Sequence, residues 1–251
     1  MMREKIIVLG GSSGIGKATA VRFAMEGWRV LVAALNINEC TATVNQLKGE
    51  GHAACGVDVR NYTDLEKLAE KVKEVFGKYD VLVNCVGISE CTPIIDSDFS
   101  DWDNSVQVMM YGSVKACKLL VPLLKDNGRI IQLTSIHYCR VAYGSSAYGM
   151  AKAAITQFTR SLAIELAPRN ILANTIAPGF VNTPMSVKAD GKNELDSAWF
   201  KSNYIDAGRL PLKRAATPAE IAGVAWFLAG PDASYITGSV ITVDGGLTIT
   251  F

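Results

Sequence analysis

Hydrophobic residues follow two alternating patterns along the chain. Short runs rich in Val, Ile, Leu and Ala lie at residues 6–9, 29–34, 53–57, 81–86, 129–134, 171–177 and 239–243. Between them, hydrophobic residues recur at helical spacing over residues 15–26, 64–76, 102–124, 148–166 and 218–228, and a more polar helical stretch ends by residue 49. The pattern predicts seven strands joined by helices.

The predicted strands are apolar on both sides, which is typical of a parallel sheet covered by helices on both faces. Right-handed crossovers then give a doubly wound, seven-stranded, mainly parallel α/β sheet of the Rossmann type. We expect a single domain over residues 1–251. Residues 186–209 are polar and lack a strong period, so we expect this long loop to form a lid over a substrate.

Composition narrows the expected partners. The net charge is +1 and the 25 basic residues are scattered, so we expect no nucleic-acid or membrane-surface partner. No apolar run approaches the ~20 residues of a membrane span, and residues 1–5 lead straight into the first strand without room for a signal peptide. The six cysteines occur singly and the two histidines lack neighbours at metal-ligand spacing. We therefore expect a cytoplasmic protein with reduced thiols and no metal site.

A glycine-rich turn joins the first predicted strand to the first helix. Residues 9–16 read L-G-G-S-S-G-I-G, with Gly10, Gly14 and Gly16 in a G-x-x-x-G-x-G spacing. Glycines let the backbone approach a pyrophosphate, which the helix N-terminus attracts. Many turns are rich in glycine, but this position in a doubly wound fold is where dinucleotides bind. The turn therefore predicts a dinucleotide site.

Tyr148 and Lys152 stand four residues apart, as neighbours on one helix face. A free tyrosine has a pKa of about 10, and a nearby ammonium lowers it, so such a pair can carry protons near neutral pH. Alone, this spacing is more often a surface pair. Ser135, however, ends a predicted strand thirteen residues upstream. All three side chains are therefore expected at the carboxyl edge of the sheet, where ligands bind.

Together these features resemble the short-chain dehydrogenase/reductase family. The family's glycine loop usually reads T-G-x-x-x-G-I-G, and here only the leading Thr is replaced, by Leu9. The resemblance covers essentially the whole chain. It includes D-V at 58–59, N-C-V-G at 84–87, P-G-F-V-N-T at 178–183 and C-terminal motifs at 218–222, 235–238 and 243–246.

The resemblance implies an NAD(P)-dependent oxidoreductase that interconverts a ketone and a secondary alcohol. Tyr148 would be the general acid and base, Lys152 would hold the nicotinamide ribose and lower the Tyr148 pKa, and Ser135 would bind the carbonyl oxygen. Relatives are homotetramers or homodimers built on helices such as 102–124 and 148–166. The expected cofactor contacts are Gly10, Ser12, Ser13, Gly14, Ile15, Gly16, Ala34, Leu35, Asn36, Asp58, Val59, Asn84, Val86, Gly87, Tyr148, Lys152, Pro178, Gly179, Val181 and Thr183.

The second strand is followed by neither the acidic residue typical of NAD enzymes nor the basic residue typical of NADP enzymes. Residues 32–36 read V-A-A-L-N. Without a carboxylate nothing repels a 2′-phosphate, and Ser12, Ser13 and Asn36 can donate hydrogen bonds to it. The sequence therefore favours NADP over NAD.

Met109 departs from the family pattern. Seven residues after Trp102, the family commonly has an Asn that contributes to a water-mediated proton relay. A thioether does not replace the hydrogen bonds of an amide, although the backbone carbonyl there can still hold the relay water. We expect slower or altered proton exchange; the alternative is a simple packing substitution.

The substrate wall is expected to include His137, Tyr143, Phe180 and Met185, and this lining favours a neutral or mainly apolar carbonyl compound. Two alternatives stay open. Arg129 and Arg169 resemble docking positions of 3-oxoacyl-(acyl-carrier-protein) reductases, although a solvated arginine is common at strand ends. Some relatives are non-catalytic nucleotide-binding sensors, but retention of the Ser, Tyr and Lys argues against that role.

Overall fold

Seven parallel strands form one sheet in the computed structural model, which describes residues 4–89, 91–188 and 190–250. The order across the sheet is β3-β2-β1-β4-β5-β6-β7, and every pair of neighbours is parallel. The predicted doubly wound α/β fold is confirmed, with a sheet that is wholly parallel. The strands are β1 (Lys5–Leu9), β2 (Arg29–Ala34), β3 (Ala53–Gly56), β4 (Tyr79–Asn84), β5 (Leu124–Leu133), β6 (Leu172–Pro178) and β7 (Val240–Val243).

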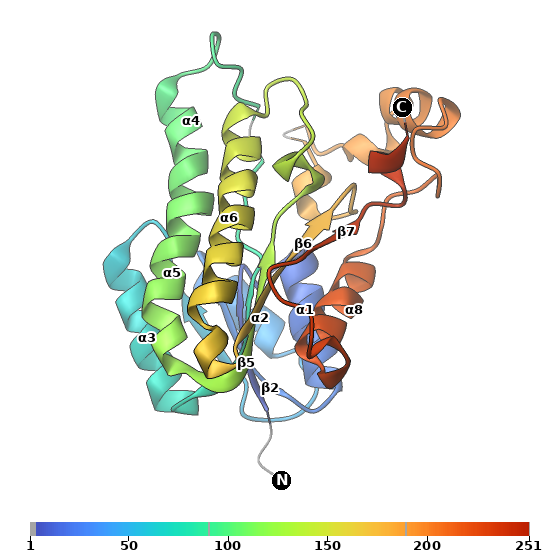
Figure 1. Cartoon of the computed structure of the whole chain (residues 1–251). Helices are drawn as coiled ribbons and strands as arrows, with labels where there is room; N and C mark the ends of the chain where they lie inside the picture. The colour runs from blue at the N-terminus through green and yellow to red at the C-terminus, as the bar shows by residue number, and fades with distance from the viewer. Residues whose placement is uncertain (1–3, 90, 189, 251) are drawn as a thin grey trace.

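Helices cover both faces of the sheet (Figure 1). Alternate residues of β1 face opposite ways, since Ile6 and Val8 join one buried cluster and Ile7 and Leu9 join the other. The first cluster packs against α1, α2 and α8, and the second against α3, α5 and α6. The main helices are α1 (Gly14–Met25), α2 (Ile37–Val44), α3 (Tyr62–Phe76), α4 (Phe99–Val106), α5 (Gly112–Leu120), α6 (Ser146–Glu165) and α8 (Pro218–Ala229).

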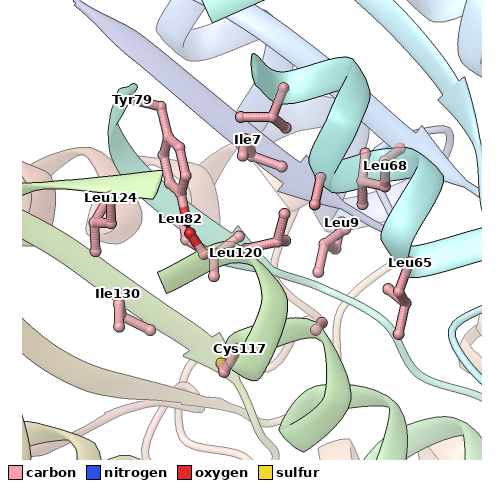
Figure 2. Packing of buried hydrophobic residues seen from close by; sticks show 14 of the residues in the cluster. Ile7, Leu9, Leu65, Leu68, Tyr79, Leu82, Cys117, Leu120, Leu124 and Ile130 are labelled. Atoms are coloured by element: carbon pink, nitrogen blue, oxygen red, sulfur yellow. Dashed lines mark hydrogen bonds between the residues drawn. The ribbon is translucent and has the colours of Figure 1, made fainter. Parts of the chain in front are cut away.

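The cluster beneath α3 and α5 shows how sequence periodicity becomes packing (Figure 2). Leu65 and Leu68 of α3 and Leu120 of α5 are fully buried against the sheet. Each buried leucine side chain contributes about 1.5–3 kcal/mol to folding. The Tyr79 hydroxyl, also buried, donates to the Leu120 carbonyl oxygen at 3.0 Å. This bond anchors the end of α5 to the start of β4.

The long helix predicted at residues 102–124 is divided. A π-helical turn, Gln107–Tyr111, separates α4 from α5. A 3₁₀ turn containing Pro122 ends the helical stretch before β5, because proline lacks an N–H for the helix. Residues 129–134, predicted as the strand, include the part of β5 that pairs regularly with β4 after a register shift.

The chain reverses its direction across the sheet between β3 and β4. It moves outward from β1 to β2 and β3 and then returns to the other side of β1 at β4. Such a switch point leaves a crevice at the carboxyl ends of the strands. The turn after β1 and the turn after β4 both end there, so the fold brings the glycine loop together with residues 84–87.

The segment predicted as a lid, residues 186–209, lies near the carboxyl end of the sheet (Figure 1). It contains a 3₁₀ turn, the short helix α7 (Ala198–Phe200) and a π turn, Lys201–Asp206. Ala189 lies outside the described residues. The ring of Phe180, just after β6, contacts the Phe200 ring edge-on at a centroid distance of 4.9 Å. The segment is therefore packed against the end of the sheet rather than extended into solvent.

From the sequence we expected no signal peptide, no membrane span and no metal site. Residues 1–3, on which the prediction of no signal peptide partly rests, lie outside the described part of the chain. Within that part, no helix combines the length and apolar character that crossing a membrane requires. Nor do three His, Cys, Asp or Glu side chains gather as a metal site needs within residues 4–89, 91–188 and 190–250.

Candidate active site

A cavity of about 380 Å³ opens at the switch point. Most of the predicted cofactor contacts line it: Gly10, Ser12, Ser13, Gly14, Ile15, Gly16, Ala34, Leu35, Asp58, Val59, Val86, Gly87 and Thr183. Residues not predicted for this wall complete it: Ala33, Val57, Arg60, Cys85, Ile88, Asn104, Val108, Pro184 and Met185. Cys85 stands inside a predicted motif, whereas Asn104 and Val108 belong to a helical stretch without one, and only the fold brings them here.

The backbone of the glycine loop lies too close to its neighbours for a Cβ at Gly10, Gly11 or Gly16. Gly10 has φ +69°, and a Cβ there would lie 2.9 Å from the carbonyl carbon of Cys85. A Cβ at Gly16 would lie 2.0 Å from the Gly10 carbonyl oxygen. Ser13 caps α1 without a side-chain hydrogen bond, and the first turn carries no acidic residue. The N-terminus of α1 therefore keeps its attraction for a phosphate group.

Lys152 is buried beside Tyr148, one turn along α6. Its Nζ lies 5.5 Å from the centroid of the Tyr148 ring and donates to the Leu133 carbonyl oxygen at 3.0 Å. Only 3% of the residue is exposed, and this burial lowers the Lys152 pKa to about 8. The ammonium is therefore fixed in place, and it titrates close to physiological pH.

The Tyr148 hydroxyl has a pKa that the sequence did not predict. Burial raises it, and a hydrogen bond with Ser135 lowers it only part of the way. We expected a lowered Tyr148 pKa, but in the protein alone burial outweighs the influences that lower it. The physical reason is position, because the ammonium stands over the ring and the surrounding protein excludes the water that would solvate a phenolate.

A second cavity, of about 190 Å³, brings Ser135 and Tyr148 together. Two of the four predicted substrate residues, His137 and Phe180, line it. The other lining residues are Ser89, Ile136, Ser145 and Gly179. The two serines are polar groups that the sequence analysis missed, since they stand in turns without a motif of their own.

Tyr143 and Met185 do not line this second cavity. Tyr143 is 83% exposed and lines neither cavity, because the turn before α6 directs it outward. Met185 lines the larger cavity instead. Tyr143 and Met185 each lie a few residues after a predicted site motif. The irregular turns in which they stand determine where their side chains point.

Asn84 supports the larger cavity without lining it. The residue is buried, and its Nδ2 donates to Ser113 Oγ at 2.9 Å and to Gln132 Oε1 at 2.8 Å. Its Oδ1 accepts the backbone N–H of Val86 at 3.1 Å, which holds the turn after β4. The remaining predicted contacts, Asn36, Lys152, Pro178 and Val181, also lie outside both cavity walls, while Tyr148 and Gly179 line the smaller one.

His137 carries an unusual nitrogen. Its Nδ1 is buried and has no hydrogen-bond partner among the described residues. The ring meets the Tyr148 ring edge-on at a centroid distance of 5.7 Å. Burial lowers the His137 pKa, so the imidazole is neutral at pH 7. A buried polar atom without a partner is rare in proteins, and here it belongs to a residue that lines the smaller cavity.

Comparison with known proteins identifies the family. A family model described as enoyl-(acyl carrier protein) reductase matches residues 10–248. The 3-oxoacyl-[acyl-carrier-protein] reductase of Thermotoga maritima is 35% identical over 250 residues, which cover 97% of each chain. The chain belongs to the short-chain dehydrogenase/reductase family. Its activity class is therefore that of an oxidoreductase using NAD(P).

Other short-chain dehydrogenases/reductases are similarly close. The short-chain reductase protein NovJ of Streptomyces niveus is 36% identical, and the alignment covers 96% of this chain and 92% of NovJ. A solved structure from Brucella melitensis, a short-chain dehydrogenase/reductase of the glucose/ribitol dehydrogenase type, has a TM-score of 0.87. It is 31% identical, with 97% of this chain and 96% of that one covered.

The larger cavity of this short-chain dehydrogenase/reductase fits a dinucleotide. A Cβ at Gly87 would lie 3.4 Å from Lys152 Nζ, and one at Gly14 would lie 3.3 Å from Thr183 Cγ2. Bare backbone at these points leaves room for a flat ring and a ribose near Lys152. The glycine loop and the N-terminus of α1 would hold the pyrophosphate. The family implies NAD(P), and the residues present suit it.

Met109, at the family's common Asn position, is completely buried in the π-helical turn. It packs with Ala151 and Ile155 of α6. Its carbonyl oxygen accepts the Ser113 hydroxyl at 2.6 Å, so one of the two lone pairs is already occupied. The packing role has direct support, and altered proton exchange stays a prediction.

Arg129 and Arg169 are bound within the fold. Arg169 contacts Asp126 at 2.8 Å and also donates to the carbonyls of Val121 and Leu124. Arg129 donates to the backbone carbonyls of the two residues just before it, Asn127 and Gly128. Arg129 stands where β5 begins its regular pairing with β4, and Arg169 precedes β6, so both lie away from the strand ends that carry Ser135. Their hydrogen bonds explain them as structural residues.

The cofactor prediction did not take Glu39 into account. No carboxylate follows β2 directly, but Glu39 of α2 lies beside Ser12 and Asn36. Ser12 Oγ donates to Glu39 Oε2 at 3.2 Å, and Asn36 Nδ2 donates to Glu39 Oε1 at 3.3 Å. Two of the three groups expected to donate to a 2′-phosphate therefore donate to a carboxylate instead.

Proposed function

We propose that this short-chain dehydrogenase/reductase interconverts a small neutral ketone and its secondary alcohol, with Tyr148 as general acid and base. One observation supports this most directly. The Ser135 and Tyr148 hydroxyls share a cavity of about 190 Å³, and the Lys152 ammonium is buried against the Tyr148 ring. A bound NAD(P) supplies or accepts the hydride.

The side chains divide the work of reduction as follows. Ser135 Oγ donates a hydrogen bond to the carbonyl oxygen and stabilises the negative charge that develops there. Tyr148 gives its hydroxyl proton to the same oxygen. The raised pKa of Tyr148 keeps that proton available before the substrate binds. Lys152, a cation below its pKa of about 8, stabilises the phenolate that remains.

The walls of the smaller cavity favour a polar substrate over the mainly apolar one expected from the sequence. Three serines and His137 line it, beside the apolar surface of Phe180. No described lining residue carries a charge at neutral pH, because burial keeps His137 neutral. A small ketone that also carries hydroxyl groups matches this lining. A solved relative from Thermoplasma acidophilum, 28% identical, is an aldohexose dehydrogenase.

His137→Phe tests the polar wall. The variant keeps a ring of similar size but loses both ring nitrogens. We expect KM for a hydroxyketone to rise about tenfold, since one hydrogen bond to a buried group is lost, with kcat changed less than about threefold. KM for a matched ketone without the hydroxyl stays unchanged. Steady-state kinetics on the two ketones measures both KM values and tests whether His137 binds the substrate hydroxyl. His137→Asn is the hydrogen-bonding control. An equal rise for both ketones would contradict the assignment.

The function itself is tested by a substrate panel with NADH and NADPH. The panel contains small hydroxyketones, apolar ketones and an acetoacetyl thioester. Reduction of the hydroxyketones with the highest kcat/KM supports the proposal. Preference for the thioester points to the acyl reductases among the relatives, and cofactor binding without turnover of any compound points to a sensor.

The remaining expectations stay predictions. Residues 186–209 are proposed as a lid because their aromatic residues contact Phe180 in the cavity wall. A homotetramer or homodimer is expected from the family, and an apolar hollow of about 240 Å³ between α5 and α6 lies on the helices named for it. Sedimentation velocity measures the oligomer directly, and a monomer at micromolar concentration would contradict it. The cytoplasmic location likewise stays a prediction.

A further inference from the structure

A hydrogen-bonded junction joins three segments that are far apart in the sequence. Thr92 follows β4, Trp102 belongs to α4, and Ser146 begins α6, which lies beside α4 (Figure 1). The Trp102 indole Nε1 donates to Ser146 Oγ at 3.0 Å, and Ser146 Oγ donates to the Thr92 carbonyl oxygen at 3.1 Å. The Thr92 N–H donates to the Gly144 carbonyl oxygen at 2.7 Å. Both backbone groups of Thr92 are therefore held by the start of α6 and the turn before it.

Two of the joined segments also line the smaller cavity. Ser89 stands three residues before Thr92, and Ser145 and Tyr148 stand on either side of Ser146 in the sequence. Trp102 and Ser146 themselves line neither cavity. The junction therefore ties two parts of the cavity wall to each other from outside the cavity.

The chemistry of the three groups fixes the direction of each hydrogen bond. An indole N–H can only donate, and a carbonyl oxygen can only accept. Because a serine hydroxyl has a single proton, Ser146 accepts from Trp102 and gives that proton to Thr92. Thr92 is only 1% exposed, so bulk water competes little for its carbonyl oxygen. Removing the indole N–H would free the Ser146 hydroxyl to turn and would weaken its hold on Thr92.

We propose that Trp102 is a positioning residue that sets the width of the substrate cavity through Ser146 and Thr92. The inference rests on the proposed function, because it concerns the ketone bound beside Tyr148. With the junction intact, the segment that carries Ser89 is held against the start of α6. With the junction broken, this segment can move away and the cavity widens. A displacement of ~1 Å in a bound substrate slows a reaction strongly, so a small ketone loses most, while a larger ketone gains room.

The test measures steady-state kinetics on the best small ketone of the panel and on the same ketone enlarged by a branched alkyl group. Trp102→Phe keeps an aromatic ring beside Phe99 but removes the indole N–H. We expect kcat/KM to fall about tenfold for the small ketone and less than about threefold for the enlarged one. The preference for the small ketone therefore falls by about threefold or more. Binding of NADH and NADPH should stay within about twofold of wild type, because Trp102 does not line the larger cavity.

Ser146→Ala breaks the same junction with a smaller change of shape. It should show the same loss of size preference, and the double variant should lose little more, because both changes remove one interaction. Hydrogen exchange at the Thr92 amide reports on the junction without turnover. Both variants should speed this exchange about tenfold or more, since the amide opens more often when the carbonyl side of Thr92 is released.

Trp28→Phe is the matched control. Trp28 is buried against Phe23 and Trp226 and lines neither cavity, so its variant should lose stability but keep the size preference. Faster exchange at Thr92 with an unchanged size preference would show a purely structural junction and would overturn the inference. Unchanged exchange in both junction variants would overturn it too. If wild-type protein reduces no ketone of the panel, the proposed function fails, and this inference fails with it.

Discussion

Tyr148→Phe is expected to lower kcat/KM for ketone reduction by about 10³-fold or more, because the general acid is removed from the carbonyl. The phenyl ring keeps the packing against His137 and Lys152. Binding of NAD(P)H should therefore remain within about twofold of wild type. The measurement pairs steady-state kinetics on the best ketone of the panel with a nucleotide titration.

Tyr143→Phe is the matched control for Tyr148→Phe. The same hydroxyl is removed five residues away, from a side chain that is 83% exposed and outside both cavities. The control should keep wild-type kinetics. If Tyr148→Phe retained a tenth of the activity, another group would have to supply the proton, and the role given to Tyr148 would be wrong.

Lys152→Met is expected to reduce activity and to raise stability together. The ammonium that stabilises the phenolate is lost, so kcat/KM falls by about 10²-fold or more. Lowering the Lys152 pKa from 10.5 to about 8 corresponds to roughly 3 kcal/mol against the folded state at pH 7. Leaving the Leu133 carbonyl unpaired costs about 1–2 kcal/mol in return. The free energy of unfolding should thus rise by about 1–2 kcal/mol.

The difference in stability between wild type and Lys152→Met depends on pH. The folded-state pKa is about 8 and the ordinary lysine value is 10.5, so between these values the unfolded chain holds the proton more tightly. Wild-type protein therefore gains stability relative to the variant as the pH rises through this window. Urea unfolding at pH 7 and pH 10 should show the gap closing. Lys73→Met, at an exposed position of α3, should leave stability and activity unchanged, and a variant at Lys152 that is less stable at pH 7 would contradict the burial argument.

Stability and function are in opposition at this residue. A buried methionine suits the apolar surroundings of α6 better than an ammonium does. The chain nevertheless keeps a lysine there, one helical turn from Tyr148. A residue that destabilises its own fold is expected where its charge is needed for chemistry.

Residues close in sequence were predicted well where a regular element sets their geometry. Tyr148 and Lys152 lie on one helix turn, so their proximity follows from helix geometry alone. Ser135 could be added because a parallel sheet aligns the ends of its strands. Tyr143 shows the limit, since it lies between Ser135 and Tyr148 in sequence but in an irregular turn. No periodicity determines where a turn directs a side chain, and this one points it into solvent.

The hydrophobic pattern by itself determined the seven strands, their helices and the edge at which the glycine loop, Ser135 and Tyr148 meet. These features depend on local periodicity and on a few topological rules. Tertiary structure alone decided the return of Glu39 to the glycine loop, the polar lining around His137 and the raised pKa of Tyr148. The physical reason is that desolvation and charge proximity depend on everything packed around a group, including segments far away in the sequence.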